Sequence, residues 1–328
     1  MEFFKTRLIN QIRCWGSYAL SVAGVHKVHH LPVFVSVEPA NFCQLACPEC
    51  PVGMKSEGVR VTEDGKKGVM SVEDFRCIVN KVAPFVHTMQ LFWQGEPLLN
   101  DRLPEMVRIA REAGIYTIIS TNAQRLNQST ALALAQAGLN RIIVSMDGWT
   151  QASYEQYRRG GSVEQAKQAV RLLRQAKMQT GAHMLIELQC LYLKTNEHEW
   201  QIFRREYRHL GADRLTMKTA QIYNYENGSP LMPTDARYAR YKWNAHTRTY
   251  VLKRKLRNRC YRLWSGCVID VKGNVLPCCY DKQQAFVLGN ILNSNTSLAD
   301  IWHNKKAAGF RQAVLRRRAS IPMCTNCE

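Results

Sequence analysis

Three cysteines near the start of the chain have the spacing of a metal-binding loop. Cys43, Cys47 and Cys50 are separated by three and then two residues, so one short loop can bring three thiolates to a compact centre. Three ligands suit a four-iron, four-sulfur cluster in which one iron stays open, whereas a structural zinc site usually has four ligands in two separated pairs. Chance would produce this spacing about 0.02 times per chain of this cysteine content. The loop therefore predicts an open iron–sulfur cluster, with zinc or chance spacing as alternatives.

A second group of cysteines lies near the carboxyl terminus, where six of the twelve fall in the last 69 residues. A two-residue gap lets the last pair face one metal, and Gly273-Asn274 is typical of a hairpin turn. The predicted ligands of one closed cluster are Cys260, Cys278, Cys324 and Cys327. A structural zinc ion in the same set is the alternative. Cys267 or Cys279 could replace one of these ligands.

Residues 33–220 alternate between apolar strands and amphipathic helices. Strands are predicted at residues 33–39, 88–93, 115–120, 141–146, 185–193 and 213–218. Between them, as in residues 71–85 and 162–177, apolar residues recur at helical spacing. About six βα units, fewer than the eight of a TIM barrel, predict an α/β fold with a partial (β/α)6 barrel. Because such folds carry their chemistry on loops after the strands, the cysteine loop after the first strand lies where function is expected.

Together, these features resemble the radical S-adenosylmethionine (SAM) enzymes over residues 33–220. The motifs after the second, third and fourth predicted strands are Gly95-Glu96-Pro97, Ser120-Thr121-Asn122 and Ser145-Met146-Asp147-Gly148. The resemblance implies that the first three cysteines hold a [4Fe–4S] cluster whose open iron binds the amino and carboxylate groups of SAM. One departure is Glu49, which stands where the family usually has an aromatic residue.

The resemblance also implies direct contacts to SAM. Glu96 would accept a charge-assisted hydrogen bond from the methionine ammonium group. An arginine would bind the methionine carboxylate as a bidentate fork, with Arg158 the first choice and Arg159 the second. Each motif alone could be an ordinary turn or cap, but their order after successive strands favours the cofactor role. The predicted contacts are Gly95, Glu96, Pro97, Ser120, Asn122, Ser145, Asp147 and Arg158.

The carboxyl-terminal cysteines resemble the SPASM and twitch extensions of the same family. Their pattern of a cysteine, about a dozen residues and then Gly-x4-Cys matches Cys260 and Cys278. A full SPASM extension continues with further cysteines, but this sequence stops at Glu328, so one auxiliary [4Fe–4S] cluster is expected. The predicted segments are an N-terminal helical segment at 1–32, the barrel at 33–220, a basic linker leading into a helix at 221–256, and the auxiliary-cluster domain at 257–328.

Three residues beside the second cluster are weaker candidates for catalysis. Asp281 could take a proton from substrate, although a side-chain cap in a turn is the commoner role. Cys267 and Cys279 could be free thiols that donate a hydrogen atom. An extra cysteine is more often a small buried apolar residue, which is how we interpret Cys14, Cys77 and Cys190.

The chain is strongly basic, and most of the surplus lies near its carboxyl terminus. The net charge is +19, and residues 237–328 hold 18 basic against 4 acidic side chains. A hydrophobic content of 46 % excludes a disordered chain. Residues 237–262 interleave basic and aromatic residues, which suits an anionic substrate or membrane surface, nucleic acid, or a solvated amphipathic helix. Because the charge lies mainly outside the barrel, we expect an anionic substrate at its mouth and not a nucleic-acid binder.

The first residues predict neither a membrane span nor a secretory signal. The apolar stretch at residues 14–25 has 12 residues, where a spanning helix needs about 20, and no convincing cleavage site follows it. A cytoplasmic protein is predicted. Residues 1–27 are expected to form a helix over the base of the barrel. The alternative is a peripheral position on a membrane, with Lys5, Arg7 and Arg13 flanking apolar residues.

The resemblance implies an enzyme that receives an electron from a donor such as flavodoxin or ferredoxin. SAM would be cleaved to methionine and a 5′-deoxyadenosyl radical, which abstracts hydrogen from a C–H bond. The auxiliary cluster would accept an electron or shape the pocket. We favour an oxidoreductase acting on an anionic small or carrier-linked (for example lipid-linked) molecule, because only 42 residues precede Cys43 and leave no room for a leader-binding domain. The alternatives are a maturase of a ribosomally made peptide and a non-catalytic nucleic-acid or membrane binder.

Overall fold

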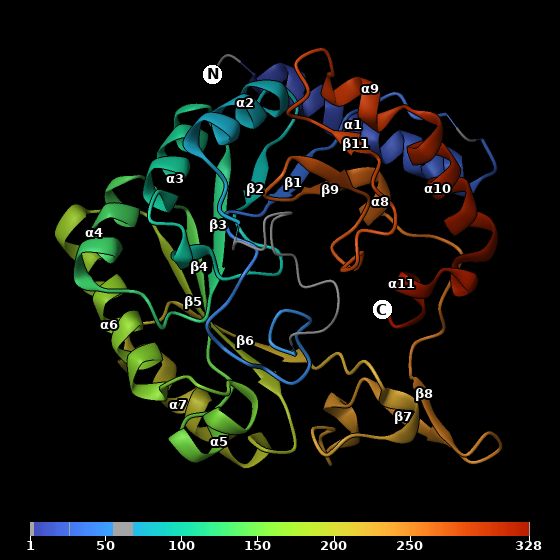
Figure 1. Cartoon of the computed structure of the whole chain (residues 1–328). Helices are drawn as coiled ribbons and strands as arrows, with labels where there is room; N and C mark the ends of the chain where they lie inside the picture. The colour runs from blue at the N-terminus through green and yellow to red at the C-terminus, as the bar shows by residue number, and fades with distance from the viewer. Residues whose placement is uncertain (1–2, 26, 55–67, 328) are drawn as a thin grey trace. The chain divides into compact units, whose positions relative to one another are not determined.

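A computed structural model describes residues 3–25, 27–54 and 68–327 (Figure 1). By their contacts, the residues form two compact units. Unit 1 comprises Met1–Phe42, Arg60–Ile119 and Leu256–Cys327, and unit 2 comprises Cys43–Val59 and Ser120–Lys255. Each unit therefore joins segments that are distant in the sequence. No helix in the described ranges is long and apolar enough to cross a membrane.

Unit 1 is built on a sheet in which the strands from both ends of the chain pair directly. The parallel strands β1 (Phe34–Val37), β2 (Thr88–Gln90) and the start of β3 (Tyr116–Thr121) lie in that order. The other edge of β1 pairs with β9 (Gly266–Ile269), which is also parallel. The strands β10 (Asn274–Leu276) and β11 (Gly289–Asn290) extend the sheet with antiparallel pairing. The carboxyl-terminal segment thus completes the sheet that β1 begins.

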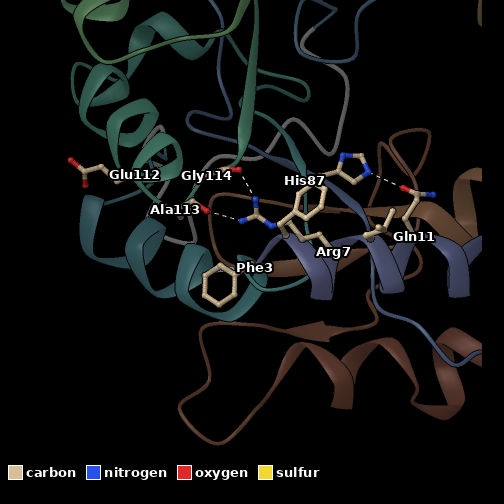
Figure 2. A pocket seen from close by; sticks show the side chains of 9 residues that line it. Phe3, Arg7, Gln11, His87, Glu112, Ala113 and Gly114 are labelled. Carbon is tan, nitrogen blue, oxygen red and sulfur yellow. Dashed lines mark hydrogen bonds between the residues drawn. The ribbon is translucent and has the colours of Figure 1, made fainter. Parts of the chain in front are cut away.

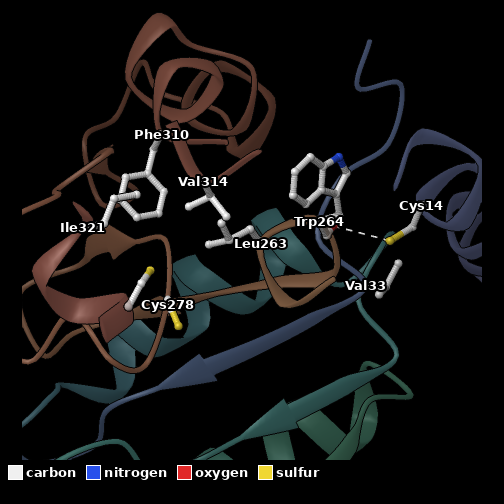
Figure 3. Packing of buried hydrophobic residues seen from close by; sticks show 9 residues of the cluster. Cys14, Val33, Leu263, Trp264, Cys278, Phe310, Val314 and Ile321 are labelled. Atoms are coloured by element: carbon white, nitrogen blue, oxygen red, sulfur yellow. Dashed lines mark hydrogen bonds between the residues drawn. The ribbon is translucent and has the colours of Figure 1, made fainter. Parts of the chain in front are cut away.

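The helices of unit 1 have clear start signals in the sequence. Ser71 accepts a hydrogen bond from the Asp74 backbone N–H at the start of α2, and Ser297 and Asp300 form a capping box at α9. The helices are α1 (Phe4–Val22), α2 (Val72–Val82), α3 (Leu103–Glu112), α8 (Arg262–Ser265), α9 (Leu298–Trp302), α10 (Lys305–Arg317), α11 (Pro322–Thr325) and the 3-10 helices η1 (Pro97–Leu99) and η5 (Arg318–Ser320). A core cluster that includes Cys14, Trp264 and Val314 packs α1, α8 and α10 together (Figure 3).

Helix α1 covers the amino-terminal ends of the strands in unit 1. The Arg7 guanidinium donates hydrogen bonds to the carbonyls of Ala83 (2.9 and 2.7 Å) and Ala113 (2.6 Å), which precede β2 and β3. Asn10 exchanges two hydrogen bonds with the backbone of Leu31, just before β1. The helix therefore lies at the base of the strands, as the sequence analysis expected.

Unit 2 contains three parallel strands covered by helices. The strands are β4 (Arg141–Ser145), β5 (Leu185–Tyr192) and β6 (Arg214–Thr219), in that order. The helices are α4 (Gln128–Gln136), α5 (Gln151–Tyr157), α6 (Val163–Thr180), α7 (Trp200–Leu210) and the 3-10 helix η2 (Glu197–Glu199). Asn127, Thr150 and Ser162 cap the first three helices. All six strands predicted from apolar runs are present, and the α/β class with parallel strands is confirmed.

Residues 221–256 differ from the helix that was expected there. The segment holds η3 (Tyr225–Asn227), η4 (Ala236–Tyr238) and an antiparallel hairpin of β7 (Tyr241–Asn244) and β8 (Thr249–Leu252). Trp243 packs edge-on against Tyr250 across the hairpin, with ring centroids 5.3 Å apart. Tyr241 is buried, whereas both Lys242 and Trp243 are exposed. The helix prediction was wrong because no two-residue alternation marks the strands of this hairpin in the sequence.

The two units also cut across the predicted segment boundaries. Residues 33–220 contribute to both units, and the predicted auxiliary-cluster domain at 257–328 packs with residues 1–42 in unit 1. The pairing of Val35 with Cys267 shows why. The two paired residues are more than 200 positions apart, and such a pairing leaves no local pattern in the sequence. Domain boundaries predicted from consecutive segments therefore miss it.

Candidate iron–sulfur and cofactor site

The first cysteine loop belongs to unit 2 and follows β1 in the chain. Cys47 is buried, while Cys43 and Cys50 are half-buried in the same apolar cluster. The Cys50 backbone N–H donates to the Cys47 carbonyl (3.2 Å), which tightens the loop. A side chain at Gly53 would place its Cβ 2.5 Å from the Cys47 nitrogen, so the loop can pass there only as glycine. The sequence spacing therefore does produce one compact turn with three thiols.

Arg158 supplies positive charge to this loop. Burial raises the pKa of the Cys47 thiol, and the Arg158 guanidinium opposes that shift. The negative charges of Cys50 and Asp147 raise the pKa of Cys47 further. The thiolate is the form that binds iron. Arg158 therefore favours the iron-binding form of Cys47, the most buried cysteine of this loop.

Asp147 holds Arg158 in place. The Arg158 Nε donates to Asp147 Oδ2 at 2.5 Å, and the two side chains are 16 % and 1 % exposed. The other carboxylate oxygen, Oδ1, accepts a hydrogen bond from the Leu191 N–H (2.7 Å), and Asn196 Nδ2 donates to the Asp147 carbonyl (2.9 Å). The structure thus brings together two predicted cofactor residues, but as partners of each other. It favours a positioning role for Asp147.

Asn122 connects the end of β3 to the cysteine loop. Its Nδ2 donates to Cys43 Sγ (3.4 Å), and its Oδ1 accepts hydrogen bonds from Gln44 Nε2 (3.1 Å) and the Gln124 N–H (3.0 Å). Ala123 has a φ of 62°, a left-handed conformation that costs a non-glycine residue about 1 kcal/mol. That strained turn aims Asn122 at the thiol.

The two predicted serines lie on strands, and Glu49 has a structural partner. Ser145 is buried at the end of β4, and Ser120 is half-buried on β3. The Glu49 carboxylate accepts a hydrogen bond from the Tyr223 backbone N–H (2.9 Å), while burial raises the pKa of Glu49. The residue that departs from the family pattern therefore ties the cysteine loop to the segment after β6.

The Gly95-Glu96-Pro97 motif lies in unit 1, where it makes a tight turn. A Cβ on Gly95 would lie 2.0 Å from the Ala40 carbonyl oxygen. The Glu96 N–H donates to the Phe42 carbonyl (2.9 Å), and its Oε1 accepts from the Leu98 N–H (3.0 Å) as the cap of η1. Glu96 is only 3 % exposed. The structure thus shows the turn that the sequence offered as the simpler explanation, and this turn buries the carboxylate.

Three cysteines of the second set surround Arg318 in unit 1. Arg318 Nη2 donates to Cys327 Sγ (3.1 Å), and its Nη1 donates to the Arg259 carbonyl (2.8 Å). Burial raises the pKa values of Cys324, to about 11, and of Cys327, and the Arg318 cation opposes both shifts. Negative charge on Cys260 also acts on Arg318. The predicted pair and Cys260 therefore share one cationic partner that the sequence analysis missed.

The adjacent thiols Cys278 and Cys279 differ in their surroundings. Cys278 lies in the apolar cluster drawn in Figure 3. A hydrogen bond from Cys278 lowers the pKa of Cys279 to about 6, and negative charge on Cys279 acts on Cys327. The Cys279 carbonyl also accepts a hydrogen bond from Trp93 Nε1 (3.0 Å). Cys279 is thus the stronger candidate to replace Cys278 as fourth ligand.

The other two candidates for catalysis, Cys267 and Asp281, are buried in the packed structure. Cys267 lies on β9, is 2 % exposed, and has a thiol pKa raised to about 12 by burial. Asp281 is 2 % exposed, and its carboxylate accepts hydrogen bonds from the backbone N–H groups of Ala285 and Phe286, both at 2.9 Å. These contacts favour the packing and turn-capping alternatives over a direct part in catalysis.

Both donor sets suit iron–sulfur clusters. All twelve cysteines are free thiols, and each set offers soft sulfur ligands beside a buried arginine. Among the described residues, no three His, Cys, Asp or Glu side chains converge on a single metal ion. In a cubane cluster the thiolates bind separate irons, so a cluster needs no such convergence.

Sequence reasoning missed several polar residues that support these cysteines. They are Gln44, Gln124, Asn196 and Arg318. Gln44 directly follows Cys43, and Gln124 lies two residues after Asn122. Their proximity to these motifs in the sequence could have indicated a supporting role. Asn196 and Arg318 meet their partners only through tertiary packing, and no spacing rule identifies them.

A parallel α/β sheet with a three-cysteine loop after its first strand defines a class of iron–sulfur enzymes. The family model described as the radical SAM superfamily matches residues 37–190, and an iron–sulfur cluster-binding domain, SPASM, matches residues 260–328. The chain therefore belongs to the radical SAM superfamily and carries a carboxyl-terminal SPASM domain. [4Fe–4S] clusters and SAM are accordingly its cofactors.

Known proteins resemble the chain over most of its length. PqqA peptide cyclase of Bradyrhizobium diazoefficiens is 25 % identical over an alignment of 297 residues, and the match covers 84 % of this chain and 74 % of the cyclase. Streptococcus suis SuiB bound to the precursor peptide SuiA has a TM-score of 0.62 and 13 % identity, covering 86 % of this chain and 67 % of SuiB. BtrN in complex with AdoMet and 2-DOIA has a TM-score of 0.54 and 19 % identity, covering 90 % and 92 %. The structural matches support the fold.

Proposed function

We propose that the protein is a radical SAM enzyme that modifies a peptide. The observation that carries the proposal is the similarity to PqqA peptide cyclase across 84 % of the chain, which reaches beyond the SAM-binding region. The structure of SuiB with its precursor peptide supports the same substrate class on a related fold. These findings favour the peptide alternative over the small-molecule oxidoreductase preferred from the sequence.

In this proposal, Cys43, Cys47 and Cys50 are the ligands of the first cluster. When bound, the cluster and SAM supply a 5′-deoxyadenosyl radical that abstracts hydrogen from substrate. Arg158 stabilises the thiolate of Cys47 and would offer its guanidinium to a carboxylate, because its side chain is only 16 % exposed and Asp147 holds it through Nε. Asn122 orients Cys43 through its Nδ2. In this proposal Arg158 stabilises the negative charge of the cysteine ligands, and Asp147 and Asn122 fix the positions of Arg158 and Cys43.

The remaining predicted SAM contacts keep their roles as part of the proposal. Glu96 would accept a hydrogen bond from the methionine ammonium group, and Gly95 would hold the turn that carries Glu96, because its missing side chain lets the Ala40 carbonyl approach. Ser120 and Ser145 would donate hydrogen bonds from their strand ends. Cys260, Cys324 and Cys327 would bind the auxiliary cluster together with Cys278 or Cys279, and Arg318 would offset their charge.

Cleavage of SAM provides the first test. Anaerobically reconstituted enzyme, reduced with dithionite, should release 5′-deoxyadenosine that chromatography and mass spectrometry can measure. Cys47→Ala should abolish the product and remove about four of about eight irons per chain. Cys77→Ala is the matched control, because Cys77 lies on α2 outside both sets, and it should retain both activity and iron. Absence of 5′-deoxyadenosine from the wild type would eliminate every catalytic proposal and favour a non-catalytic iron–sulfur protein.

The peptide substrate needs a separate test. Synthetic peptides encoded by short reading frames beside the gene should be incubated with active enzyme and SAM. Crosslinking or oxidation should remove two hydrogen atoms, and epimerisation in D2O should introduce one deuterium, both visible by mass spectrometry. If the enzyme cleaves SAM yet leaves every such peptide unchanged, the peptide proposal fails while the radical SAM assignment stands.

The second candidate is oxidation of an anionic small or carrier-linked molecule. The strongly basic composition of residues 237–328, with 18 basic and 4 acidic side chains, favours this substrate class. A panel of phosphorylated sugars and nucleotide sugars is the appropriate probe. Turnover of one of them, with peptides unmodified, would replace the peptide proposal.

A further inference from the structure

Helix α1 buries its small and polar side chains and exposes its large apolar ones, which is the opposite of the usual pattern for a helix on the surface of a water-soluble protein. Its buried face carries Asn10, Cys14, Ser17 and Ser21, which recur every three or four residues and are polar or small. A helix that packs against a core normally buries its bulky apolar residues and exposes polar ones. Because small and polar residues occupy the inward face of α1, its bulky apolar residues point away from the core.

The opposite face of α1 exposes a row of large apolar side chains. Phe4, Leu8, Ile12 and Trp15 are 68 %, 51 %, 56 % and 57 % exposed, and they follow one another at helical spacing. Further exposed apolar residues beside this row are Ile9, Leu20 and Val22. A contiguous apolar surface of this kind marks an interaction site. We refer to this face as the α1 apolar face.

The helix cannot turn this face inward, because its polar side chains anchor it. Figure 2 shows Arg7 reaching the carbonyls of Ala113 and Gly114, and Gln11 reaching His87. The Gln11 Oε1 and His87 Nε2 are 2.8 Å apart. These bonds fix the rotation of α1 about its axis, so the apolar face is a permanent feature of the folded unit.

Positive charge adjoins the α1 apolar face beside the middle of the helix and at its carboxyl-terminal end, while Glu112 lines the hollow next to Phe4 and Leu8. Within the described residues α1 has no acidic side chain, and Lys5 and Arg13 are exposed on it. A cavity of about 960 Å³ lies beside the middle of the helix and is lined by Arg13, Lys27, His29 and His303 among others.

A second basic cavity adjoins the carboxyl-terminal end of α1. It has a volume of about 380 Å³ and lies between Val22 and helix α10. Arg257, Arg259 and Arg316 line it, and none of the described residues that line it is acidic. The chain thus combines an apolar helix face with two flanking cavities that suit phosphate groups.

We propose that α1 docks unit 1 onto an anionic phospholipid surface. The α1 apolar face would lie in the interfacial layer of the bilayer, and the flanking arginines and lysines would bind lipid phosphates. Interfacial helices combine these two properties, and their binding strength follows buried apolar area plus attraction to anionic lipids. A second copy of the chain fits less well, because a two-fold contact through α1 would bring the same cationic cavities together.

Vesicle sedimentation tests this proposal with the full-length holoprotein. The protein should sediment with vesicles of phosphatidylcholine and phosphatidylglycerol, bind phosphatidylcholine alone far more weakly, and dissociate as salt is raised. Leu8→Glu and Ile12→Glu should each reduce the partition coefficient at least about tenfold. Arg257→Glu and Arg316→Glu, which each reverse a charge, should each reduce it at least about fivefold. All four side chains are exposed, so the variants should fold and should cleave SAM like the wild type.

The control variant carries the same change on an unrelated exposed apolar residue. Met178 on α6 is 71 % exposed, and Met178→Glu should bind vesicles like the wild type. A second readout is the shift of tryptophan fluorescence to shorter wavelength on vesicle binding, which Trp15→Phe should diminish. Equal binding of Ile12→Glu and the wild type, or no binding to anionic vesicles, would overturn the proposal. So would a stable dimer that Ile12→Glu dissociates, since that result assigns the face to a second copy.

Discussion

The buried ion pair between Asp147 and Arg158 is the most consequential side-chain contact in unit 2. A carboxylate that is 1 % exposed stabilises a guanidinium that in turn acts on Cys47. Removing one partner of such a pair leaves a buried charge without compensation, which costs far more than the loss of an exposed pair. Under the proposed function, stability and cofactor binding would therefore both depend on these two residues.

We expect Asp147→Asn to lower the free energy of unfolding by about 3–5 kcal/mol. It should also weaken SAM binding, because Arg158 loses the contact that orients it. Urea denaturation and equilibrium binding of SAM measure the two effects. Glu164→Gln is the control, since Glu164 pairs with Lys167 on the surface of α6 and its loss should change neither quantity. An Asp147→Asn protein as stable as the wild type would show that the pair is dispensable.

His30 makes unit 1 sensitive to acid. The ring is 3 % exposed, and its Nε2 lies 2.6 Å from the Trp264 carbonyl oxygen. Burial lowers the pKa of His30 to about 4, the bond to Trp264 opposes this shift, and the charges of Arg311, His303 and His29 add to it. The native ring is therefore neutral across the range in which an unfolded histidine takes up a proton.

Stability should consequently fall as the pH drops from about 6.5 to about 4. In that window the unfolded chain binds a proton that the native chain does not, so the loss accumulates to about 3 kcal/mol. His30→Gln replaces the ring nitrogen that faces the Trp264 carbonyl with an amide N–H donor that does not titrate, so it should flatten the pH dependence by up to one proton. Denaturation at several pH values, at matched iron content, provides the measurement. Exposed His246→Gln should behave like the wild type, and an unchanged slope in His30→Gln would assign the acid sensitivity to other groups.

At the scale of elements, close backbone contacts decide where glycine is required. Gly95 follows β2 and has no room for a Cβ beside Ala40 and Phe42. We expect Gly95→Ala to destabilise the protein by about 1–3 kcal/mol, because two backbone atoms would have to move. Gly16 lies on α1 with no atom within 4 Å of an added Cβ, so Gly16→Ala should stabilise by about 0.5–1 kcal/mol. Thermal melts of both variants check the opposite signs, and equal shifts would contradict this account.

Much of the fold could be predicted from the sequence where the signal is local. The six parallel strands coincide with apolar runs, and the helices between them begin at residues such as Ser71 and Ser162 that cap by their own side chains. The hairpin around Trp243 and Tyr250 was missed because its strands lack the alternation of buried and exposed residues that marks a strand in a sequence. The pairing of β9 with β1 was missed because it joins distant segments.

The candidate site divides in the same way. The cysteine spacing predicted a compact loop, and the backbone hydrogen bond from Cys50 to Cys47 tightens it, because two short steps along the chain leave little freedom. The pairing of Asp147 with Arg158 was not predicted, since it depends on where α5 ends relative to β4. Arg318 was missed for the same reason, because its contact with Cys327 arises in the fold of η5 and α11. Residues that support ligands through tertiary contacts lie beyond what spacing can reveal.

At the scale of the whole molecule, unit 1 depends on both ends of the chain. Deleting residues 257–328 would remove β9 from the edge of β1 and uncover the core around Cys14 and Val33. We expect the truncated protein to be insoluble, because an unpaired buried edge strand promotes aggregation. Co-expression of the missing segment should restore solubility. A soluble 1–256 fragment with a cooperative thermal transition would show that the two segments fold separately.

The pairing of β1 with β9 also has a consequence for synthesis on the ribosome. Phe34 pairs with Gly266, so β1 leaves the ribosome long before its partner strand is made. At about 5–20 residues per second the delay is roughly 10–50 s. Residues 120–255 of unit 2 are complete within that interval, so this unit can fold first. During the same interval β1 has one exposed edge, which is when the nascent chain depends most on chaperones.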